Sequence, residues 1–242
     1  MDLKNIVVLI DADNVNRPTK IKAVLNEISA YGRIVVKRAY GNWKKSQLKN
    51  WDEVVKDSAI KAVQQFDYVS GKNASDMALT IEAMDLLFQK IYDGFVIVSS
   101  DSDFTPLAMR LHEAGVFVVG VGREVTSESF KNSCDEFLAL ESIEEEDETQ
   151  EKSEEKKSPE KIKYHLGELH NLLKIADDKW GDDEGFVRLD RASEYIKRAK
   201  PDFNIKNYGY PKLIKFVEAF EKRYEIKRRG TENIIYYRCK KR

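Results

Sequence analysis

The sequence predicts an α/β fold with a doubly wound, mainly parallel sheet, followed by a small winged helix-turn-helix-like domain. Over about the first 140 residues, short runs of β-branched and aromatic residues alternate with amphipathic helical patterns, as in repeated strand–helix–strand units. A charged stretch over residues 141–157 interrupts this alternation. Beyond it the chain has three helical patterns and two short β-like runs near its end.

Five short apolar runs are the expected strands of the sheet. Their mostly continuous apolar character is the pattern of strands that are covered on both faces. They lie at residues 6–10, 34–36, 66–69, 95–98 and 116–121.

Helical patterns lie between these strands. The first begins at about Pro18, with proline in its first turn, and ends near Gly32. A second covers residues 75–90 and has one broad apolar face. A third opens with Thr105 as its N-cap and Pro106 as its first helical residue.

The charged stretch over residues 141–157 separates two domains. It has almost no apolar side chains to bury, so ordering it would cost more free energy than it returns. A single exposed charged helix is the alternative. We therefore expect domains at residues 1–142 and 162–242, joined by a flexible acidic linker over residues 143–161.

The second domain has the pattern of a winged helix. Amphipathic helices are expected at residues 166–173, 189–199 and 210–220. Two β-like runs at residues 224–227 and 234–237 flank a glycine-containing turn and predict a hairpin.

The composition limits the class of protein. No apolar run in the 242 residues is long enough to cross a bilayer, and the chain begins without the pattern of a secretory signal. The two cysteines lie far apart, which disfavours a disulfide scaffold or a cysteine-based zinc site. The net charge is only −1, but charge is unevenly distributed along the chain. We therefore expect a cytoplasmic protein with no membrane partner.

Carboxylates follow several of the predicted strands. Asp11 and Asp13 come directly after the first strand, and Asp101 and Asp103 come after the fourth. Asp76 lies in the first turn of a helix that follows the third strand. The carboxyl ends of parallel strands meet at one edge of a sheet, where ligands usually bind. We therefore expect these carboxylates to form one acidic cleft.

Uncompensated carboxylates in one place repel each other and raise each other's pKa. A hard divalent cation, Mg²⁺ or Mn²⁺, removes this penalty and prefers oxygen ligands. Such a cation can polarise a phosphodiester and activate a bound water, and no histidine or cysteine is well placed as a nucleophile. Each acid by itself is more typical of a turn or a helix cap, but their shared position at strand ends favours a metal site.

Three segments of the chain resemble the signature segments of NYN domains. They are LIDADN at residues 9–14, KNASD at residues 72–76 and SSDSDF at residues 99–104. VGVGRE at residues 119–124 and CDEF at residues 134–137 also resemble the LabA-like branch of that family.

The resemblance covers about residues 4–140 and implies a PIN-like nuclease fold with metal-dependent ribonuclease activity. By matching motifs, the resemblance implies that four acids are catalytic metal ligands and that a fifth is a less certain ligand. The four are Asp11, Asp76, Asp101 and Asp103, and the fifth is Asp13. Asn14 would orient a ligand water or the phosphate. Ser100 departs from the pattern, because the family commonly has glycine there. Whether one or two metal ions bind is left open.

Several polar and basic residues flank the expected cleft and are candidates to contact RNA. Lys72 is favoured because it stands four residues before Asp76, and Trp43 offers a ring on which a base can stack. Solvated lysines and a packed tryptophan are the alternative interpretation. The further candidates are Asn14, Arg17, Lys20, Arg38, Lys44, Lys45 and Ser99.

The second domain carries positive charge on its third helix and its hairpin, as nucleic-acid-binding winged helices do. The residues concerned are Lys212, Lys215, Arg228 and Arg229. The segments at residues 201–203 and 207–213 resemble an OST-HTH (LOTUS) domain over about residues 162–242. That family binds RNA, and proteins in some members, and it occurs joined to NYN domains.

Other interpretations of these patterns stay open. The protein could be an RNA-binding adaptor whose acidic cleft turns over little substrate. A phosphatase of the haloacid dehalogenase type also has Asp-x-Asp after its first strand, with Asp11 as nucleophile here. A protein partner or a homodimer through either domain is also open. The Gly120–Gly122 fragment favours a structural turn over a dinucleotide site, and no Walker A motif is present.

Overall fold

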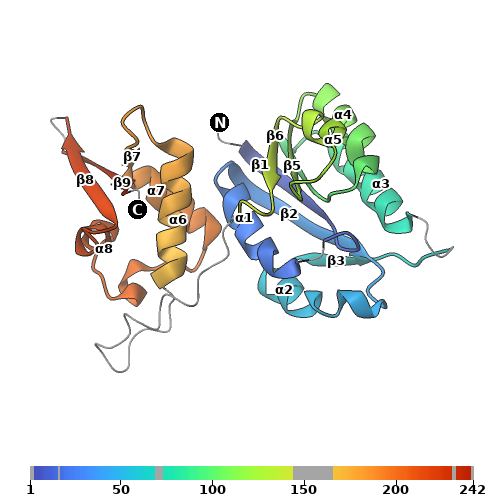
Figure 1. Ribbon diagram of the computed structural model, residues 1–242, viewed down its shortest axis with the longest axis horizontal. Helices are drawn as coiled ribbons and strands as arrows, with labels where there is room; N and C mark the ends of the chain where they lie inside the picture. The colour runs from blue at the N-terminus through green and yellow to red at the C-terminus, as the bar shows by residue number, and fades with distance from the viewer. Residues whose placement is uncertain (1–2, 16, 69–72, 144–165, 231–232, 241–242) are drawn as a thin grey trace. The chain divides into compact units, whose positions relative to one another are not determined.

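The computed structural model describes residues 3–15, 17–68, 73–143, 166–230 and 233–240. The chain divides into two compact units, Met1–Glu144 and Glu145–Arg242 (Figure 1). The first holds the parallel sheet and the second holds a bundle of helices with a small antiparallel sheet.

The first unit is built on a six-stranded sheet in which every strand pair is parallel. The strand order is β3-β2-β1-β4-β5-β6, so the chain reverses its direction of winding between β1 and β4. This is the doubly wound α/β architecture that the alternating pattern predicted. The strands are β1 Leu3–Asp11, β2 Gly32–Gly41, β3 Lys61–Gln64, β4 Gly94–Val98, β5 Phe117–Gly122 and β6 Glu136–Ala139.

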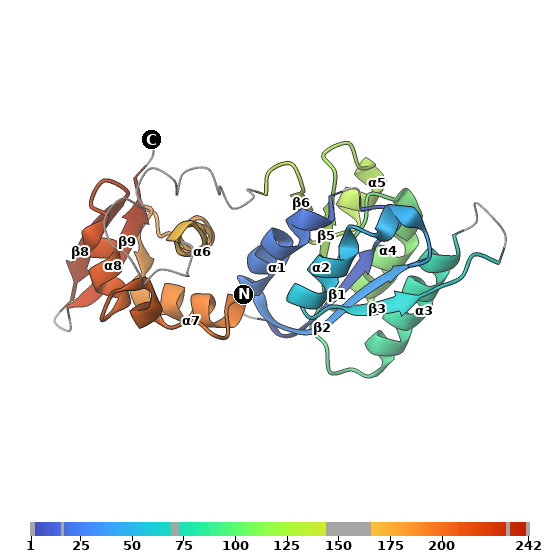
Figure 2. The same cartoon turned by 90° about the horizontal axis from the view of Figure 1, so that it is seen from below.

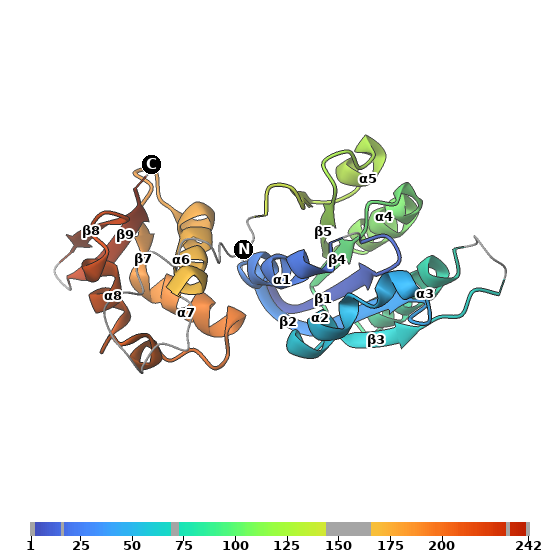
Figure 3. The same cartoon turned by 60° about the horizontal axis from the view of Figure 1, so that its bottom comes forward.

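Helices cover both faces of this sheet (Figure 2, Figure 3). One face packs against α1 (Ile21–Ser29) and α2 (Trp51–Asp57). The other packs against α3 (Ala74–Phe88), α4 (Thr105–Glu113) and α5 (Glu128–Asn132). Three short 3-10 turns lie at η1 Pro18–Lys20, η2 Ser46–Leu48 and η3 Ser102–Phe104.

The central strand shows why its sequence is apolar without a break. Val8 and Ile10 belong to the core under α1 and α2, whereas Val7 and Leu9 belong to the core under α3 and α4. Successive side chains of a strand point to opposite faces, so a strand with helices on both sides needs apolar residues at every position. All four side chains are fully buried.

The third strand lies earlier than the sequence pattern indicates. β3 is Lys61–Gln64, whereas residues 66–68 form no strand and Val69 falls outside the described residues. β3 is an edge strand that pairs only with β2, and three of its four residues are exposed. It therefore lacks the apolar run by which the buried strands are recognised.

The start of α4 also differs from the expectation. Thr105 is the first helical residue and Phe104 is the N-cap, so Thr105 does not cap the helix. The side-chain cap lies one turn earlier, where Asp101 accepts a hydrogen bond from the amide of Asp103 at the start of η3.

The second unit is a winged helix, as predicted. Its helices are α6 (Leu166–Trp180), α7 (Leu189–Ala199) and α8 (Leu213–Ala219), with a 3-10 turn η5 (Ile205–Tyr208) before α8. β8 (Tyr224–Arg229) and β9 (Ile234–Cys239) form the expected antiparallel hairpin. The short strand β7 (Val187–Arg188) pairs with β9 and was not expected.

Two properties of the whole chain follow from the described elements. Both cysteines, Cys134 and Cys239, are free thiols. None of the helices that the structure describes has the length and the apolar character that crossing a membrane requires.

Candidate metal centre

The acidic residues gather where the winding of the sheet reverses. Asp11 is the last residue of β1, and Asp101 and Asp103 lie in the turn directly after β4, the neighbouring strand. Asp76 lies in the first turn of α3. The carboxyl ends of two strands that wind in opposite directions leave a crevice between their loops. The structure therefore places these side chains at the usual ligand position of an open α/β sheet.

The charges of these carboxylates act on one another. Burial, followed by the charges of Asp101, Asp13 and Asp103, raises the pKa of Asp76. The charges of Asp76 and Asp13 act in the same direction on Asp11. The five acids therefore form one electrostatic cluster.

Asp11 is the most buried member of this cluster. Its side chain is 2 % exposed, and its Oδ2 accepts a hydrogen bond of 2.9 Å from Ser99 Oγ. Its Oδ1 is buried and has no hydrogen-bond partner among the described residues. Burial, reinforced by Asp76 and Asp13, raises the pKa of Asp11 to about 7 despite the bond from Ser99. A buried carboxylate oxygen without a partner is costly unless a ligand completes it.

The loop after β4 is held by hydrogen bonds between its own members. The amide of Asp101 donates to Ser99 Oγ over 3.1 Å, and the amide of Asp103 donates to Asp101 Oδ1 over 2.9 Å. Asn73, at the start of α3, donates from Nδ2 to Asp103 Oδ2 over 2.9 Å. Ser99 therefore joins Asp11 to this loop, and Asn73 joins the loop to α3.

Asp13 differs from the other acids because both of its oxygens have partners. Its Oδ1 lies 3.3 Å from Lys45 Nζ, and its Oδ2 accepts a 3.3 Å hydrogen bond from the amide of Asn42. Lys45 also pairs with Asp67 at 3.1 Å. Asp13 is thus the member of the cluster whose charge is compensated by the protein.

The chemistry of the cluster fits a hard divalent cation. The donors are all oxygens, and the buried Asp11 Oδ1 lacks a partner among the described residues. Within the described ranges, however, no three acidic, histidine or cysteine side chains are close enough together to hold a metal ion. Carboxylates without a cation between them repel one another, and Mg²⁺ or Mn²⁺ commonly keeps water ligands where protein oxygens are missing.

Most of the basic residues expected to flank the cleft are used by the fold itself. Arg38 forms an ion pair with Glu82 of α3, which also accepts a 2.6 Å hydrogen bond from Tyr40. Lys20 is buried and donates from Nζ to the carbonyl of Leu140 over 2.7 Å. Lys72 lies outside the described residues.

Trp43 is packed within the fold, which is the alternative to a ring that stacks on a base. Its ring meets the edge of Trp51 with centroids 6.1 Å apart, and its Nε1–H donates to the carbonyl of Val63 over 2.9 Å. Lys44 lies 5.0 Å from the centre of the Phe66 ring.

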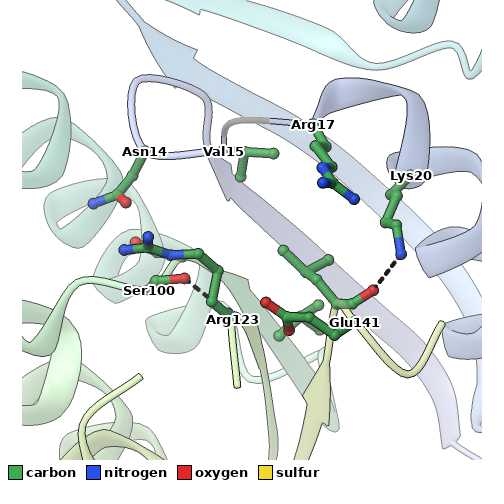
Figure 4. Close-up of a pocket in the computed structure, with 10 residues that line it drawn as sticks. Asn14, Val15, Arg17, Lys20, Ser100, Arg123 and Glu141 are labelled. Atoms are coloured by element: carbon green, nitrogen blue, oxygen red, sulfur yellow. Dashed lines mark hydrogen bonds between the residues drawn. The ribbon is translucent and has the colours of Figure 1, made fainter. Parts of the chain in front are cut away.

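A hollow of about 250 Å³ opens beside the acid cluster (Figure 4). Asn14 and Ser99, both expected to contact substrate, lie on its wall. The guanidinium groups of Arg17 and Arg123 extend along this hollow in Figure 4. Arg123 is not among the residues that the sequence predicts to bind RNA. It nevertheless follows β5 directly, and a position directly after a buried strand is the signal that identified the acids after β1 and β4.

The basic residues of the second unit that are expected to bind RNA differ in whether they already pair with acids. Lys212 is exposed at the N-cap of α8, while Lys215 pairs with Glu218 at 2.7 Å. Arg228 lies 3.5 Å from the same Glu218. Arg229 pairs with two acids of the unit, Asp182 and Glu184, and lies over the ring of Tyr236.

The six-stranded parallel sheet with flanking helices and an acidic cluster at its switch point defines a PIN-like α/β domain. The chain belongs to the NYN domain family, whose model matches residues 5–141. Residues 160–236 match the OST-HTH/LOTUS domain. The likeness to the LabA branch stays a prediction.

Two individual proteins illustrate what this chain is similar to, one by sequence and one by structure. The uncharacterized protein MJ0482 of Methanocaldococcus jannaschii is 30% identical over 127 residues. The match covers 49% of this chain and 48% of MJ0482, so the chain spans about half the length of that relative. The crystal structure of VPA0982 from Vibrio parahaemolyticus, a protein of unknown function, has 18% sequence identity and a TM-score of 0.45. The match covers 57% of this chain and 93% of the VPA0982 chain.

Proposed function

We propose that this protein is a metal-dependent ribonuclease that hydrolyses RNA phosphodiesters at the acid cluster and holds RNA with its C-terminal domain. The NYN match supports a nuclease of the PIN-like kind, and the OST-HTH/LOTUS match supports binding of RNA. The observation that carries the proposal is the buried Asp11 Oδ1, which has no hydrogen-bond partner among the described residues and lies in a cluster of further carboxylates.

Asp11, Asp76, Asp101 and Asp103 are the residues that would hold Mg²⁺ or Mn²⁺. A bound cation would polarise a phosphoryl oxygen of the RNA and lower the pKa of a bound water. Asp13 is a weaker candidate ligand, because Lys45 and the amide of Asn42 already occupy its oxygens.

Ser99 prepares Asp11 for this role. By donating to Oδ2, the hydroxyl leaves Oδ1 as the atom available to a cation. The same hydroxyl accepts from the amide of Asp101, so two acids from neighbouring strands share one anchor. Asn14, on the wall beside them, would orient a water or the phosphate.

RNA would be held by basic side chains of both domains. The candidates in the second domain are Lys212, Lys215, Arg228 and Arg229, and Lys72 and Arg38 are the weaker candidates in the first. Contacts of this kind bind phosphates without reading the sequence.

A cleavage assay tests the proposal. The full chain is incubated with a panel of labelled RNAs in Mn²⁺ or Mg²⁺, and the Asp11→Asn and Asp76→Asn variants are compared with Asp85→Asn. Asp85 is an exposed acid on the same helix as Asp76 and serves as the matched control. We expect cleavage by the wild type and the control, and loss of at least about a hundredfold in the two site variants. Wild-type cleavage that survives excess chelator would refute the mechanism.

An RNA-binding adaptor with little turnover is the second candidate. It is favoured by the absence, within the described residues, of three side chains close enough together to hold a metal ion. Binding of RNA by both domains with no cleavage in any divalent metal would establish it. A phosphatase with Asp11 as nucleophile ranks lower, because the family match is to NYN domains. Trapping a phospho-aspartate at Asp11 would reverse that order.

A further inference from the structure

The hollow beside the acid cluster combines three basic residues, Arg17, Lys20 and Arg123, with an apolar lining. Val15 and Val121 are buried and line it together with the half-buried Leu140. Arg17 and Arg123 are both exposed, so their guanidinium groups are accessible to a ligand. Cations beside an apolar surface suit a ligand that has an anionic end and a ring.

The position of Arg123 is fixed by the backbone around it. Its amide donates to Ser100 Oγ over 2.9 Å, which ties the residue after β5 to the loop after β4. A Cβ on the preceding Gly122 would lie 2.6 Å from the carbonyl oxygen of Ser99, so only glycine allows the two segments to approach this closely. The Arg123 side chain therefore starts from a rigid point beside Ser99.

The hollow and the acid cluster share a wall. Ser99 lines the hollow while its hydroxyl donates to Asp11 Oδ2. We therefore expect a nucleic-acid strand that crosses the acids to bring a neighbouring phosphate to the arginines. Arginine is suited to that contact because its planar guanidinium binds phosphate oxygens in pairs.

Glu141 argues against a bare inorganic anion as the ligand. Its side chain lines the hollow opposite Asn14 in Figure 4, and its Oε2 accepts a 2.8 Å hydrogen bond from the amide of Glu124. A carboxylate repels a free phosphate but can accept hydrogen bonds from the hydroxyl or amino groups of a nucleotide.

We infer that this hollow is a nucleotide-binding subsite, in which Arg123 and Arg17 hold the phosphate next to the scissile one and Val15 and Leu140 pack against its nucleoside. The inference rests on the proposed function for the identity of its substrate, RNA. It assigns Arg123 as a binding residue.

The test uses the full chain and needs no cleavage. Amide signals in ¹⁵N NMR spectra are followed while adenosine 5′-monophosphate is added in excess EDTA, with inorganic phosphate as the parallel titrant. We expect saturable shifts at Asn14, Val15 and Arg123, and an affinity for the nucleotide at least about tenfold above that for phosphate. Arg123→Ala should weaken nucleotide binding about ten- to hundredfold, the range for a hydrogen-bonded charge. Arg110→Ala, an exposed arginine on α4, should leave it unchanged.

Several results would overturn the inference. They are an absence of shifts around the hollow, equal affinity for phosphate and nucleotide, and unchanged binding in Arg123→Ala. Arg17→Ala replaces Arg123→Ala if the spectrum of the latter shows unfolding. Because binding is measured without divalent metal, failure of the cleavage assay leaves this result interpretable. Nucleotide binding in a protein that cuts no RNA would uphold the subsite and reject the proposed ribonuclease.

Discussion

Asp11 is a buried carboxylate that destabilises the metal-free fold but suits the binding of a cation. As the last residue of β1 it is buried in the switch region, and the neighbouring carboxylates disfavour its charged form. Protein groups satisfy only one of its oxygens among the described residues. Such a residue lowers the stability of the metal-free protein and is tolerated where a ligand later completes it.

Replacing this carboxylate should therefore stabilise the metal-free protein. At pH 8 in excess EDTA, we expect Asp11→Asn to raise the free energy of unfolding by about 1–3 kcal/mol, because a buried charge among like charges is removed. Denaturant unfolding measures the change.

Asp85→Asn, the exposed control on α3, should change stability by less than about 0.5 kcal/mol. Addition of Mn²⁺ should stabilise the wild type and have little effect on Asp11→Asn. Destabilisation by Asp11→Asn in EDTA would contradict the view that this carboxylate is strained without a ligand.

The acids could be located from the sequence, whereas the partners of the basic residues could not. Asp11 and Asp101 follow recognisable buried strands, so chain order alone brings them to one edge. Lys20 looks like a phosphate contact in the sequence, yet it is buried and donates to backbone carbonyls near the end of β6. Which acceptor a long basic side chain meets is decided by tertiary packing, which local patterns do not record.

At the scale of elements, the buried strands were predictable and the edge strands were not. β1, β4 and β5 have cores on both faces and apolar runs to match. β3 and β6 lie at the two edges of the sheet, where fewer side chains are fully buried. The sequence pattern predicts β3 at the wrong residues and does not predict β6. Gly120 lies within β5 and not in a turn. A Cβ there would approach the Phe137 ring to 2.7 Å, which explains why the strand has glycine at this position.

Helix α6 contains a histidine that the sequence does not distinguish from a surface residue. His170 is buried and packs against the rings of Phe216 and Phe220, and its Nδ1 lies 2.6 Å from the hydroxyl of Tyr224. Burial, followed by the charge of Arg223, lowers the pKa of His170 from 6.5 to about 3. The folded unit therefore holds this ring neutral.

The C-terminal unit should lose stability in mild acid. The unfolded chain binds a proton at His170 near pH 6.5 and the folded chain does not, so stability is complete above that pH and falls as pH decreases toward 3. The expected slope is about 1.4 kcal/mol per pH unit. Hydrogen exchange resolved by segment, followed at α6 and α8 between pH 7 and pH 5, measures it.

His170→Asn removes the titrating ring and should remove this pH dependence, at a lower overall stability. His112→Asn is the control, because His112 lies on α4 of the other unit. If α6 and α8 keep the same stability between pH 7 and pH 5 in the wild type, the buried neutral state of His170 is wrong.

At the scale of the whole molecule, the proposal divides chemistry and RNA binding between two domains. Residues on the winged helix should then affect how much RNA is bound and leave the rate of cleavage unchanged once RNA saturates the protein. Lys212 and Lys215, both exposed on or next to α8, are the residues with which to test this.

The double variant Lys212→Ala/Lys215→Ala should raise KM for RNA and leave kcat unchanged. The affinity for RNA falls as salt rises, and each lost phosphate contact makes the slope of log affinity against log salt concentration less steep by roughly 0.7–0.9. Steady-state cleavage at several salt concentrations measures both effects, with Lys49→Ala/Lys61→Ala in the first unit as the charge-matched control. A loss of kcat with unchanged KM would contradict the division of roles.

The most direct test of the central claim is anomalous diffraction from crystals of the full chain soaked in Mn²⁺. We expect a manganese peak between Asp11, Asp76 and Asp101, with Asp11 Oδ1 as a ligand, and no such peak in Asp11→Asn crystals. No peak at this position in saturating Mn²⁺, or peaks only elsewhere on the molecule, would contradict the assignment of the acid cluster as a metal centre.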